Sequence, residues 1–292
     1  MLRGAYTLLI TPFDENMNLD EEGLRILVHR QVESRIHGIA PLGVTGENPS
    51  LTEQEIKRVV EIVVEESGGK CKVAPDTCSN SLNQTISRIN LYADVGCDYA
   101  VVFAPFLVKP TQAGVVNFYE RLAKDSKIPI IIHNAPARVG INIEPQTYAR
   151  LAKNENIIAT KDGNKEMDHL AKILYLTQGE SFNVFTGKDT TVYPLLSFGG
   201  SGVFTVAGNI IPEVMRDLVT YCLNGEFKKA EEIHNAYYDL FEALRMETNP
   251  MAMKEALTIM GLPGGGLRSP LTRLSDPKKD ILKRILKESG LI

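Results

Sequence analysis

The sequence has no excess of basic charge and no long hydrophobic run. Its 292 residues carry a formal net charge of -4, so the composition does not favour a nucleic acid or an anionic membrane surface as a partner. No stretch of about 18 apolar residues could cross a bilayer, and the start of the chain lacks the layout of a signal peptide. With 43% hydrophobic and 23% charged residues the chain is typical of a soluble globular protein, and we expect it in the cytoplasm.

Cysteine and histidine are also scarce. The four cysteines, Cys71, Cys78, Cys97 and Cys222, form no Cys-x-x-Cys pair, and a chain of this length does not need disulfide bonds for stability. The five histidines do not have the spacing of metal ligands. We therefore expect reduced thiols, no bound metal and no cofactor.

Short apolar runs alternate with helical patterns along the first two thirds of the chain. Most runs are continuously apolar, which is typical of parallel strands that helices cover on the outside. The predicted strands are residues 5–10, 38–42, 72–75, 99–104, 129–133, 157–160, 183–186 and 202–206. The predicted helices between them are residues 20–35, the segment after Thr52, 83–95, 111–124, 145–153, 166–177 and 190–198.

Eight strand–helix units without a break predict an α/β fold, a closed (β/α)8 TIM barrel. An open doubly wound sheet is the alternative, but it would normally carry a Gly-rich phosphate turn after its first strand, where Thr11-Pro12-Phe13-Asp14 stands. After Val206 the patterns are only helical, over residues 212–223, 227–246, 251–260 and 277–288. We predict a barrel domain over residues 1–210 and a C-terminal helical extension packed on it over residues 211–292.

In such a barrel the functional residues lie where strands end. The loop Gly43-Val44-Thr45-Gly46-Glu47 follows the second predicted strand. His133 ends the fifth and Arg138 follows it, Lys161 follows the sixth, and Lys188 follows the seventh.

Lys161 is the most informative of these residues because it directly follows an apolar run. Burial would remove its ammonium from water and lower its pKa, and a neutral amine can form a Schiff base with a carbonyl. The alternative is a lysine that caps a strand and extends to solvent. Lys188 is a rival nucleophile, but it stands in a polar loop beside Gly187 and Asp189, so we expect it to be solvated or ion-paired.

Over nearly its whole length the chain resembles the dihydrodipicolinate synthase / N-acetylneuraminate lyase family of class I pyruvate aldolases. The loop at 43–47 is similar to the Gly-x-Thr-Gly-Glu loop of that family. Further similar segments are Thr11-Pro12-Phe13-Asp14-Glu15, residues 134–140, the lysine strand, residues 199–203, Glu247-Thr248-Asn249-Pro250 and Leu267-Arg268-Ser269-Pro270. The last two look more like the synthase branch than the sialate lyase branch.

The resemblance implies that Lys161 forms an imine with the C2 carbonyl of pyruvate or a related 2-oxo acid. Thr45 would offer its hydroxyl and backbone N–H to the carboxylate, and Gly46 would let the ligand approach the backbone closely. Val203 would offer backbone groups to the same carboxylate. Arg138 would bind a second carboxylate, on the incoming aldehyde. Without the resemblance, we would interpret the loop at 43–47 as an ordinary tight turn and Arg138 as a surface residue.

Three positions depart from the family pattern. The family usually has a tyrosine where His133 stands, a hydroxyl residue at Val44 and a tyrosine at Leu107, which together relay protons. Valine and leucine cannot carry protons, whereas histidine can, and its ordinary pKa of about 6.5 suits acid–base work near neutrality. We predict that His133 takes over the proton transfer, with Val44 and Leu107 as apolar parts of the substrate site. The alternative is that His133 only fills space and the site is slow or silent.

The resemblance implies a lyase or synthase that joins pyruvate to a short carboxylate-bearing aldehyde such as aspartate semialdehyde. The same imine could serve an aldolase or dehydratase of 2-keto-3-deoxy sugar acids. A third interpretation, from another class, is a non-catalytic 2-oxo-acid-binding protein. The resemblance also implies a homotetramer built from two tight dimers, in which Leu107 would reach the partner's site.

Overall fold

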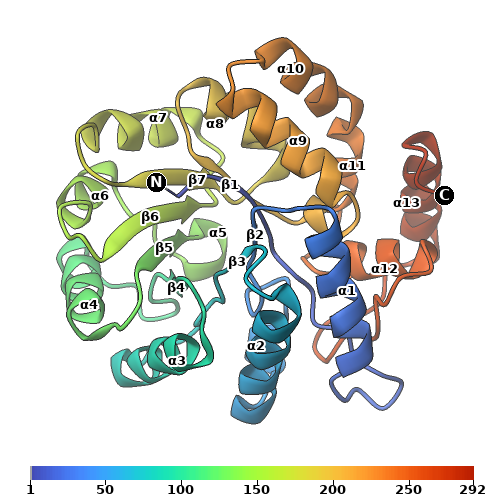
Figure 1. Ribbon diagram of the computed structural model, residues 1–292, viewed down its shortest axis with the longest axis horizontal. Helices are drawn as coiled ribbons and strands as arrows, with labels where there is room; N and C mark the ends of the chain where they lie inside the picture. The colour runs from blue at the N-terminus through green and yellow to red at the C-terminus, as the bar shows by residue number, and fades with distance from the viewer. Residues whose placement is uncertain (1) are drawn as a thin grey trace.

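The computed structural model describes residues 2–292, which form a ring of eight parallel strands with helices around it (Figure 1). Neighbouring strands follow the order β3-β2-β1-β8-β7-β6-β5-β4. Their bounds are β1 Gly4–Thr7, β2 Gly38–Ile39, β3 Lys72–Val73, β4 Ala100–Phe103, β5 Ile130–Asn134, β6 Ile157–Asp162, β7 Asn183–Thr186 and β8 Gly202–Thr205. All eight fall within or next to the predicted apolar runs.

Backbone contacts between β3 and β4 close the ring. Asp76, three residues after β3, forms a parallel bridge with Val101 of β4. The Thr77 N–H donates to the Val101 carbonyl and the Val101 N–H donates to the Pro75 carbonyl, each at 2.9 Å. The predicted barrel is therefore confirmed, and the open doubly wound sheet is wrong.

The helices alternate with the strands and cover the outside of the barrel (Figure 1). Their bounds are α1 Glu21–Glu33, α2 Glu53–Ser67, α3 Leu82–Val95, α4 Gln112–Asp125, α5 Pro136–Val139, α6 Pro145–Leu151, α7 Met167–Leu176, α8 Val192–Ser197, α9 Pro212–Leu223, α10 Phe227–Ala236, α11 Tyr238–Ala243, α12 Met251–Ile259 and α13 Asp276–Glu288. Three short 3-10 helices are η1 Asn48–Ser50, η2 Asp189–Thr191 and η3 Ala207–Asn209. A capping box begins α2, since the side chains of Thr52 and Glu55 each accept the other's backbone N–H.

Strands β1 and β2 end earlier than the predicted runs 5–10 and 38–42, and the structure differs from the predicted elements in three further places. Strand β6 runs on to Asp162, so Lys161 lies within the strand, because it pairs with His133 on one side and Phe185 on the other. The helix predicted over 227–246 is interrupted at Tyr237, where no glycine or proline marks the break. Helix α5 was not predicted, because a single turn has no apolar periodicity.

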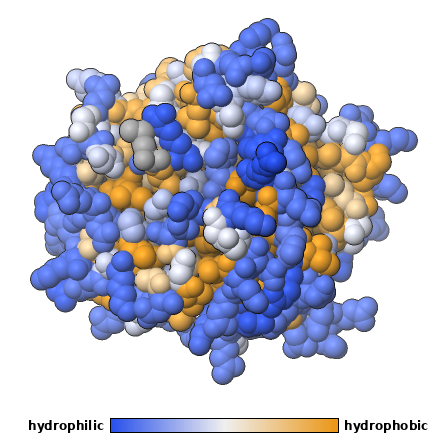
Figure 2. All heavy atoms as spheres, viewed as in Figure 1, coloured by the Kyte–Doolittle hydropathy of each residue, from blue (hydrophilic) through white to orange (hydrophobic). Residues whose placement is uncertain are grey.

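The C-terminal helices hold the last part of the chain near the ends of the barrel strands. Helix α9 packs on β1 and β8, α11 contacts η2, and α12 contacts η3. Because η2 and η3 follow β7 and β8, this packing brings the segment between α11 and α12 to the carboxyl end of the barrel. Hydrophilic side chains cover most of the rim of the face in Figure 2. Within residues 2–292 no helix has the length and apolar character needed to cross a bilayer.

Three aromatic rings fill the barrel interior. The Tyr6 and Phe204 rings stack with their centroids 5.1 Å apart, and Phe185 meets Phe204 edge to face at 5.3 Å. All three side chains are at most 2% exposed. A closed barrel of this size is filled by side chains rather than being a pore. The rings therefore close the interior below the carboxyl ends of the strands.

Candidate active site

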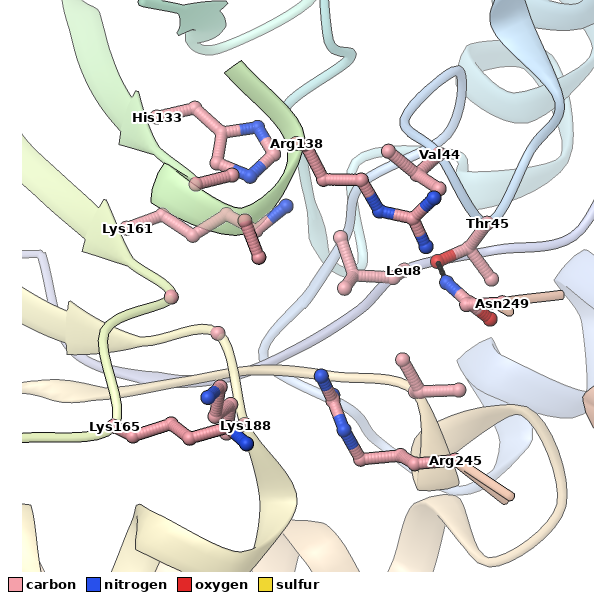
Figure 3. A pocket seen from close by; sticks show the side chains of 15 residues that line it. Leu8, Val44, Thr45, His133, Arg138, Lys161, Lys165, Lys188, Arg245 and Asn249 are labelled. Atoms are coloured by element: carbon pink, nitrogen blue, oxygen red, sulfur yellow. Dashed lines mark hydrogen bonds between the residues drawn. The ribbon is translucent and has the colours of Figure 1, made fainter. Parts of the chain in front are cut away.

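A cavity of about 170 Å³ opens at the carboxyl ends of the strands (Figure 3). Measured as space for water, that volume holds roughly a dozen molecules, which suits a small organic substrate. It is lined by Leu8, Val44, Thr45, His133, Ala135, Ala137, Arg138, Lys161, Gly163, Lys165, Gly187, Lys188, Val206, Arg245 and Asn249. The structure thus brings five of the expected site residues, from three separate strand ends, to one cavity.

Lys161 presents a desolvated amine to this cavity. The residue is 4% exposed, so its side chain does not extend to solvent. Burial lowers the pKa of Lys161 to about 8, and the charge of Asp76 opposes that shift only in part. Its Nζ lies 5.7 Å from the centroid of the Phe204 ring, the apolar filling of the barrel. A substantial fraction of the amine is therefore neutral at mildly basic pH, as a Schiff-base lysine requires.

His133 stands next to Lys161 and is held by a carboxylate. The two residues are register partners on β5 and β6, and Figure 3 shows the imidazole beside the lysine side chain. His133 Nδ1 lies 2.8 Å from Asp76 Oδ2, and the ring packs on Phe103 with centroids 3.8 Å apart. This contact directs the Nδ1 proton to Asp76 and leaves Nε2 with a free lone pair.

The pKa of His133 is not near its ordinary value, contrary to the sequence-based expectation. Burial and the neighbouring charge of Lys161 lower it to about 4, against the opposing effect of Asp76. The imidazole is therefore neutral at physiological pH, and its Nε2 is able to accept a proton. Asp76 was not singled out in the sequence, although it follows a predicted strand as the other site residues do.

The loop at 43–47 carries hydrogen-bond donors into the cavity. The Thr45 hydroxyl accepts a hydrogen bond from Asn249 Nδ2 at 2.7 Å, which leaves its own proton for a ligand (Figure 3). Within residues 2–292 neither the Val44 nor the Thr45 N–H donates to another group. The loop is therefore able to bind a carboxylate. Asn249 belongs to a segment that supported the family resemblance, but its role was not foreseen.

Three of the expected site residues do not line the cavity of their own chain. Gly46 packs so closely that a Cβ would lie 2.8 Å from the Leu42 nitrogen, so this glycine serves the turn rather than ligand access. Val203 is fully buried within β8. Leu107 is 85% exposed, on a loop held by two hydrogen bonds between Asn80 and the Phe106 backbone.

Asp162 fixes the end of β6 beside Lys161. Its Oδ2 accepts hydrogen bonds from the Asn134 amide at 2.9 Å and the Tyr148 hydroxyl at 3.0 Å, and it lies 3.1 Å from His169 Nε2. These partners come from β5, α6 and α7. The buried carboxylate thus ties three elements to the strand and limits the movement of the reactive lysine.

A buried ion pair anchors the other end of the Thr45 loop. Glu47 has a left-handed backbone conformation with φ 52°, and its carboxylate lies 2.5 Å from Lys254 Nζ. Both side chains are at most 2% exposed. The same ammonium donates to the Gly266 carbonyl at 2.6 Å and lies 4.2 Å from the Phe13 ring centroid. The pair joins the loop to α12 and the C-terminal segment.

Replacing Lys254 by alanine is expected to lower the free energy of unfolding by about 3–5 kcal/mol, because Glu47 would remain as a buried charge without its partner. The double variant Glu47→Gln/Lys254→Ala should lose clearly less unfolding free energy than the sum of the losses in Glu47→Gln and Lys254→Ala. Urea denaturation of the parent, both single variants and the double variant measures this. A double variant as unstable as that sum would show that the two side chains do not act as a pair.

Lys188 does not occupy the solvated or ion-paired position expected for it. It is 8% exposed and lines the same cavity as Lys161. Burial, together with the charges of Arg245 and Lys165, lowers the pKa of Lys188 to about 8. The expectation was wrong because the polar loop turns inward after β7. Lys165 and Arg245 had no sequence signal that distinguished them from surface cations.

Comparison with known proteins agrees with this geometry. The model of the Dihydrodipicolinate synthetase family matches residues 1–289. The 4-hydroxy-tetrahydrodipicolinate synthase of Methanospirillum hungatei is 38% identical over 288 residues, 98% of this chain and 99% of the relative. That of Methanocaldococcus jannaschii is 36% identical over the full length of both chains. The crystal structure of dihydrodipicolinate synthase from Thermotoga maritima superposes with a TM-score of 0.97 at 34% identity, covering both chains completely. The chain therefore belongs to the dihydrodipicolinate synthetase family.

Proposed function

We propose that the protein is a Schiff-base-forming lyase that condenses pyruvate with a short carboxylate-bearing aldehyde. Relatives named 4-hydroxy-tetrahydrodipicolinate synthase support this reaction type. The observation that carries the proposal is the buried amine of Lys161, with its lowered pKa, in a small cavity at the strand ends. Aspartate semialdehyde is the aldehyde that we propose first.

In the proposed reaction, Lys161 Nζ attacks C2 of pyruvate to give a carbinolamine. His133 Nε2 accepts a proton from the attacking nitrogen and passes it to the former carbonyl oxygen, which completes the carbinolamine. The C2 hydroxyl then takes up one further proton, from solvent, and leaves as water, which gives the iminium. His133 then accepts a proton from C3, and the iminium takes up the electron pair as an enamine. The enamine carbon attacks the aldehyde carbon, the new alkoxide takes the proton from His133, and water hydrolyses the imine.

Two groups position the substrates in this proposal. The pyruvate carboxylate accepts hydrogen bonds from the Thr45 hydroxyl and from the free N–H groups of the loop. Arg138 lies on the same side of the cavity as Thr45 in Figure 3. Its guanidinium binds the carboxylate of the aldehyde with two parallel hydrogen bonds. Asp76 acts as a positioning residue, because it holds His133 in the tautomer that exposes Nε2.

A second candidate is cleavage or dehydration of a 2-keto-3-deoxy sugar acid through the same imine. Val44 favours it, because valine supplies no hydroxyl at the position where the family usually has one for the proton relay. A non-catalytic 2-oxo-acid-binding protein is the candidate of another class. The buried amine argues against it, because binding alone does not need a desolvated lysine.

Reduction with sodium borohydride in the presence of pyruvate, followed by peptide mass analysis, tests the proposed function. We expect a stable adduct on the peptide that contains Lys161. An adduct on Lys188, or none, would contradict the proposal. A panel of aldehydes and 2-keto-3-deoxy acids then separates the first candidate from the second.

The rate of adduct formation is expected to rise with pH up to about 8, because the pKa of Lys161 is lowered to about 8 and only the neutral amine attacks. Below that value the rate should fall about tenfold per pH unit. His133, with its pKa lowered to about 4, should add no inflection between pH 5 and 8. Initial rates of borohydride trapping between pH 5 and 9 measure the profile, and a maximum near pH 6.5 would contradict it.

We also propose a homotetramer in the cytoplasm. Leu107 and Val108 are 85% and 67% exposed, so an isolated chain leaves an apolar tip in water. Leu107→Glu should therefore lower the molar mass in light scattering, while Ile26→Glu, at an exposed position on α1, should leave it unchanged. An unchanged mass in Leu107→Glu would contradict a role of this tip in assembly. The four free thiols agree with a reducing compartment.

A further inference from the structure

Arg138 reaches the cavity from a single turn of helix. Helix α5 spans only Pro136–Val139, and Arg138 is exposed on it. In Figure 3 its side chain extends towards Thr45. Packing fixes a long exposed side chain only weakly, so the place of the guanidinium relative to Lys161 depends on what holds the turn.

One buried side chain closes this turn at its base. Asn134, the last residue of β5, is fully buried. Its Oδ1 accepts a hydrogen bond from the Ile143 N–H at 3.3 Å, and its Nδ2 donates to Asn142 Oδ1 at 2.8 Å. The chain therefore leaves β5, passes through Arg138 and returns to the same amide eight and nine residues later. Residues 135–141, between the two ends of this closed loop, are called the Arg138 turn below.

The Asn134 amide also joins the Arg138 turn to the strand of the reactive lysine. Its Nδ2 donates a second hydrogen bond, to Asp162 Oδ2 at 2.9 Å, so both of its N–H groups have an acceptor. Asp162 follows Lys161 in β6, and successive side chains of a strand point to opposite faces. Holding Asp162 on the outer face therefore holds Lys161 towards the interior of the barrel.

Asn142 lies at the centre of these contacts. Its Oδ1 also accepts a hydrogen bond from Asn164 Nδ2 at 3.4 Å, and the Asn164 N–H donates to Asp162 Oδ1 at 2.7 Å. The Asn142 carbonyl accepts a hydrogen bond from Gln112 Nε2 of α4 at 2.8 Å. Asn142 is thus joined to Asp162 by two routes, one through Asn134 and one through Asn164. Connected hydrogen bonds of this kind make the arrangement rigid.

We propose that Asn142 is a positioning residue for the aldehyde, because it holds the Arg138 turn at a fixed place relative to Lys161. This inference rests on the proposed function and refines it. The aldehyde carbon has to meet the enamine formed on Lys161 while the carboxylate at its other end contacts Arg138. A fixed separation between these two groups selects aldehydes by the number of carbons between their ends.

Steady-state kinetics of the full-length protein with pyruvate and aspartate semialdehyde test this role. Asn142→Leu should raise the KM for the aldehyde about tenfold, because displacement of the Arg138 turn weakens the contact with the carboxylate. Asn142→Asp should restore most of the loss, since its carboxylate and that of Asp162 would each accept one N–H of Asn134. The rate of borohydride trapping with pyruvate should not change in either variant. Asn235→Leu, the same change at an exposed position on α10, is the control.

A double-mutant cycle separates positioning from a general loss of stability. In an Arg138→Ala background, Asn142→Leu should raise the KM for the aldehyde no further, because the group that it positions is gone. Asn164→Ala, which removes only one of the two routes, serves if Asn142→Leu does not fold, with an expected rise of about threefold. An equal rise with and without Arg138, or an unchanged KM in both variants, would overturn the proposal. Absence of the Lys161 adduct in the parent would instead refute the proposed function.

The selection by length gives a second measurement. The parent should discriminate in kcat/KM between succinate semialdehyde and glutarate semialdehyde, which differ by one methylene between the aldehyde and the carboxylate. Asn142→Leu should reduce this ratio at least about threefold, because Arg138 is then free to follow either carboxylate. A parent that uses both aldehydes equally well, or a variant that keeps the parent's ratio, would show that the Arg138 turn does not set the length of the substrate.

Discussion

Lys161→Met is expected to abolish adduct formation with pyruvate and to stabilise the protein at pH 7. The folded state lowers the pKa of Lys161 from 10.5 to about 8, so folding disfavours the protonated form. This cost is fully present below pH 8 and disappears as the pH rises towards 10.5. A shift of that size corresponds to roughly 3 kcal/mol, and methionine removes the charge while filling similar space.

Thermal unfolding at pH 7 and pH 10 measures this effect. The gain in Tm of Lys161→Met over the parent should shrink at the higher pH. Lys254→Met is the matched control, because the pKa of Lys254 is also lowered to about 8 by burial, yet its ammonium is paired with Glu47. That variant should be destabilised. A Lys161→Met protein that is less stable than the parent at pH 7, or that still forms an adduct, would refute the assignment.

His133→Phe is expected to lower kcat by about 10²–10⁴-fold, the usual contribution of a positioned proton carrier. The effect should fall on kcat more than on KM, because the ring is proposed to move protons rather than to hold the carboxylate. His133→Tyr should retain more activity than His133→Phe, since the two variants differ by one hydroxyl. Equal turnover in the parent and His133→Phe would show that another group carries the proton.

Asp76→Asn tests the same assignment without touching the ring. An amide in place of the carboxylate can donate to Nδ1, which would move the imidazole proton to Nε2 and block proton acceptance. We expect a loss in kcat of about 10–10²-fold, together with a change in the pH profile. If Asp76 had only a structural role, Asp76→Asn would lower the stability of the protein but leave the kcat of the folded fraction unchanged. Steady-state rates normalised to folded protein distinguish these results.

Much of the site could be predicted from the chain because strand order determines where residues meet. The apolar runs before Thr45, Arg138 and Lys161 identified three strand ends, and the ends of parallel strands share one side of a barrel. The ends of the strands were harder to predict than their existence. Strand β6 continues through Lys161 because β5 and β7 pair with it there, and the sequence of one segment does not show which strands will pair with it. The family resemblance placed Leu107 in the site, but in the folded chain its side chain is exposed and does not line the cavity.

The alternation of apolar runs and helical patterns was enough to specify a barrel and to place a reactive lysine at its mouth, because periodicity and strand-end position are properties of local sequence. The state of the ionisable groups depended on folding instead. Asp76 and His133 are 57 residues apart in the chain, and Lys188 meets Arg245 only where α11 returns to the barrel. Proton affinities follow from burial and from charges a few ångströms away, and those distances exist only in the folded protein.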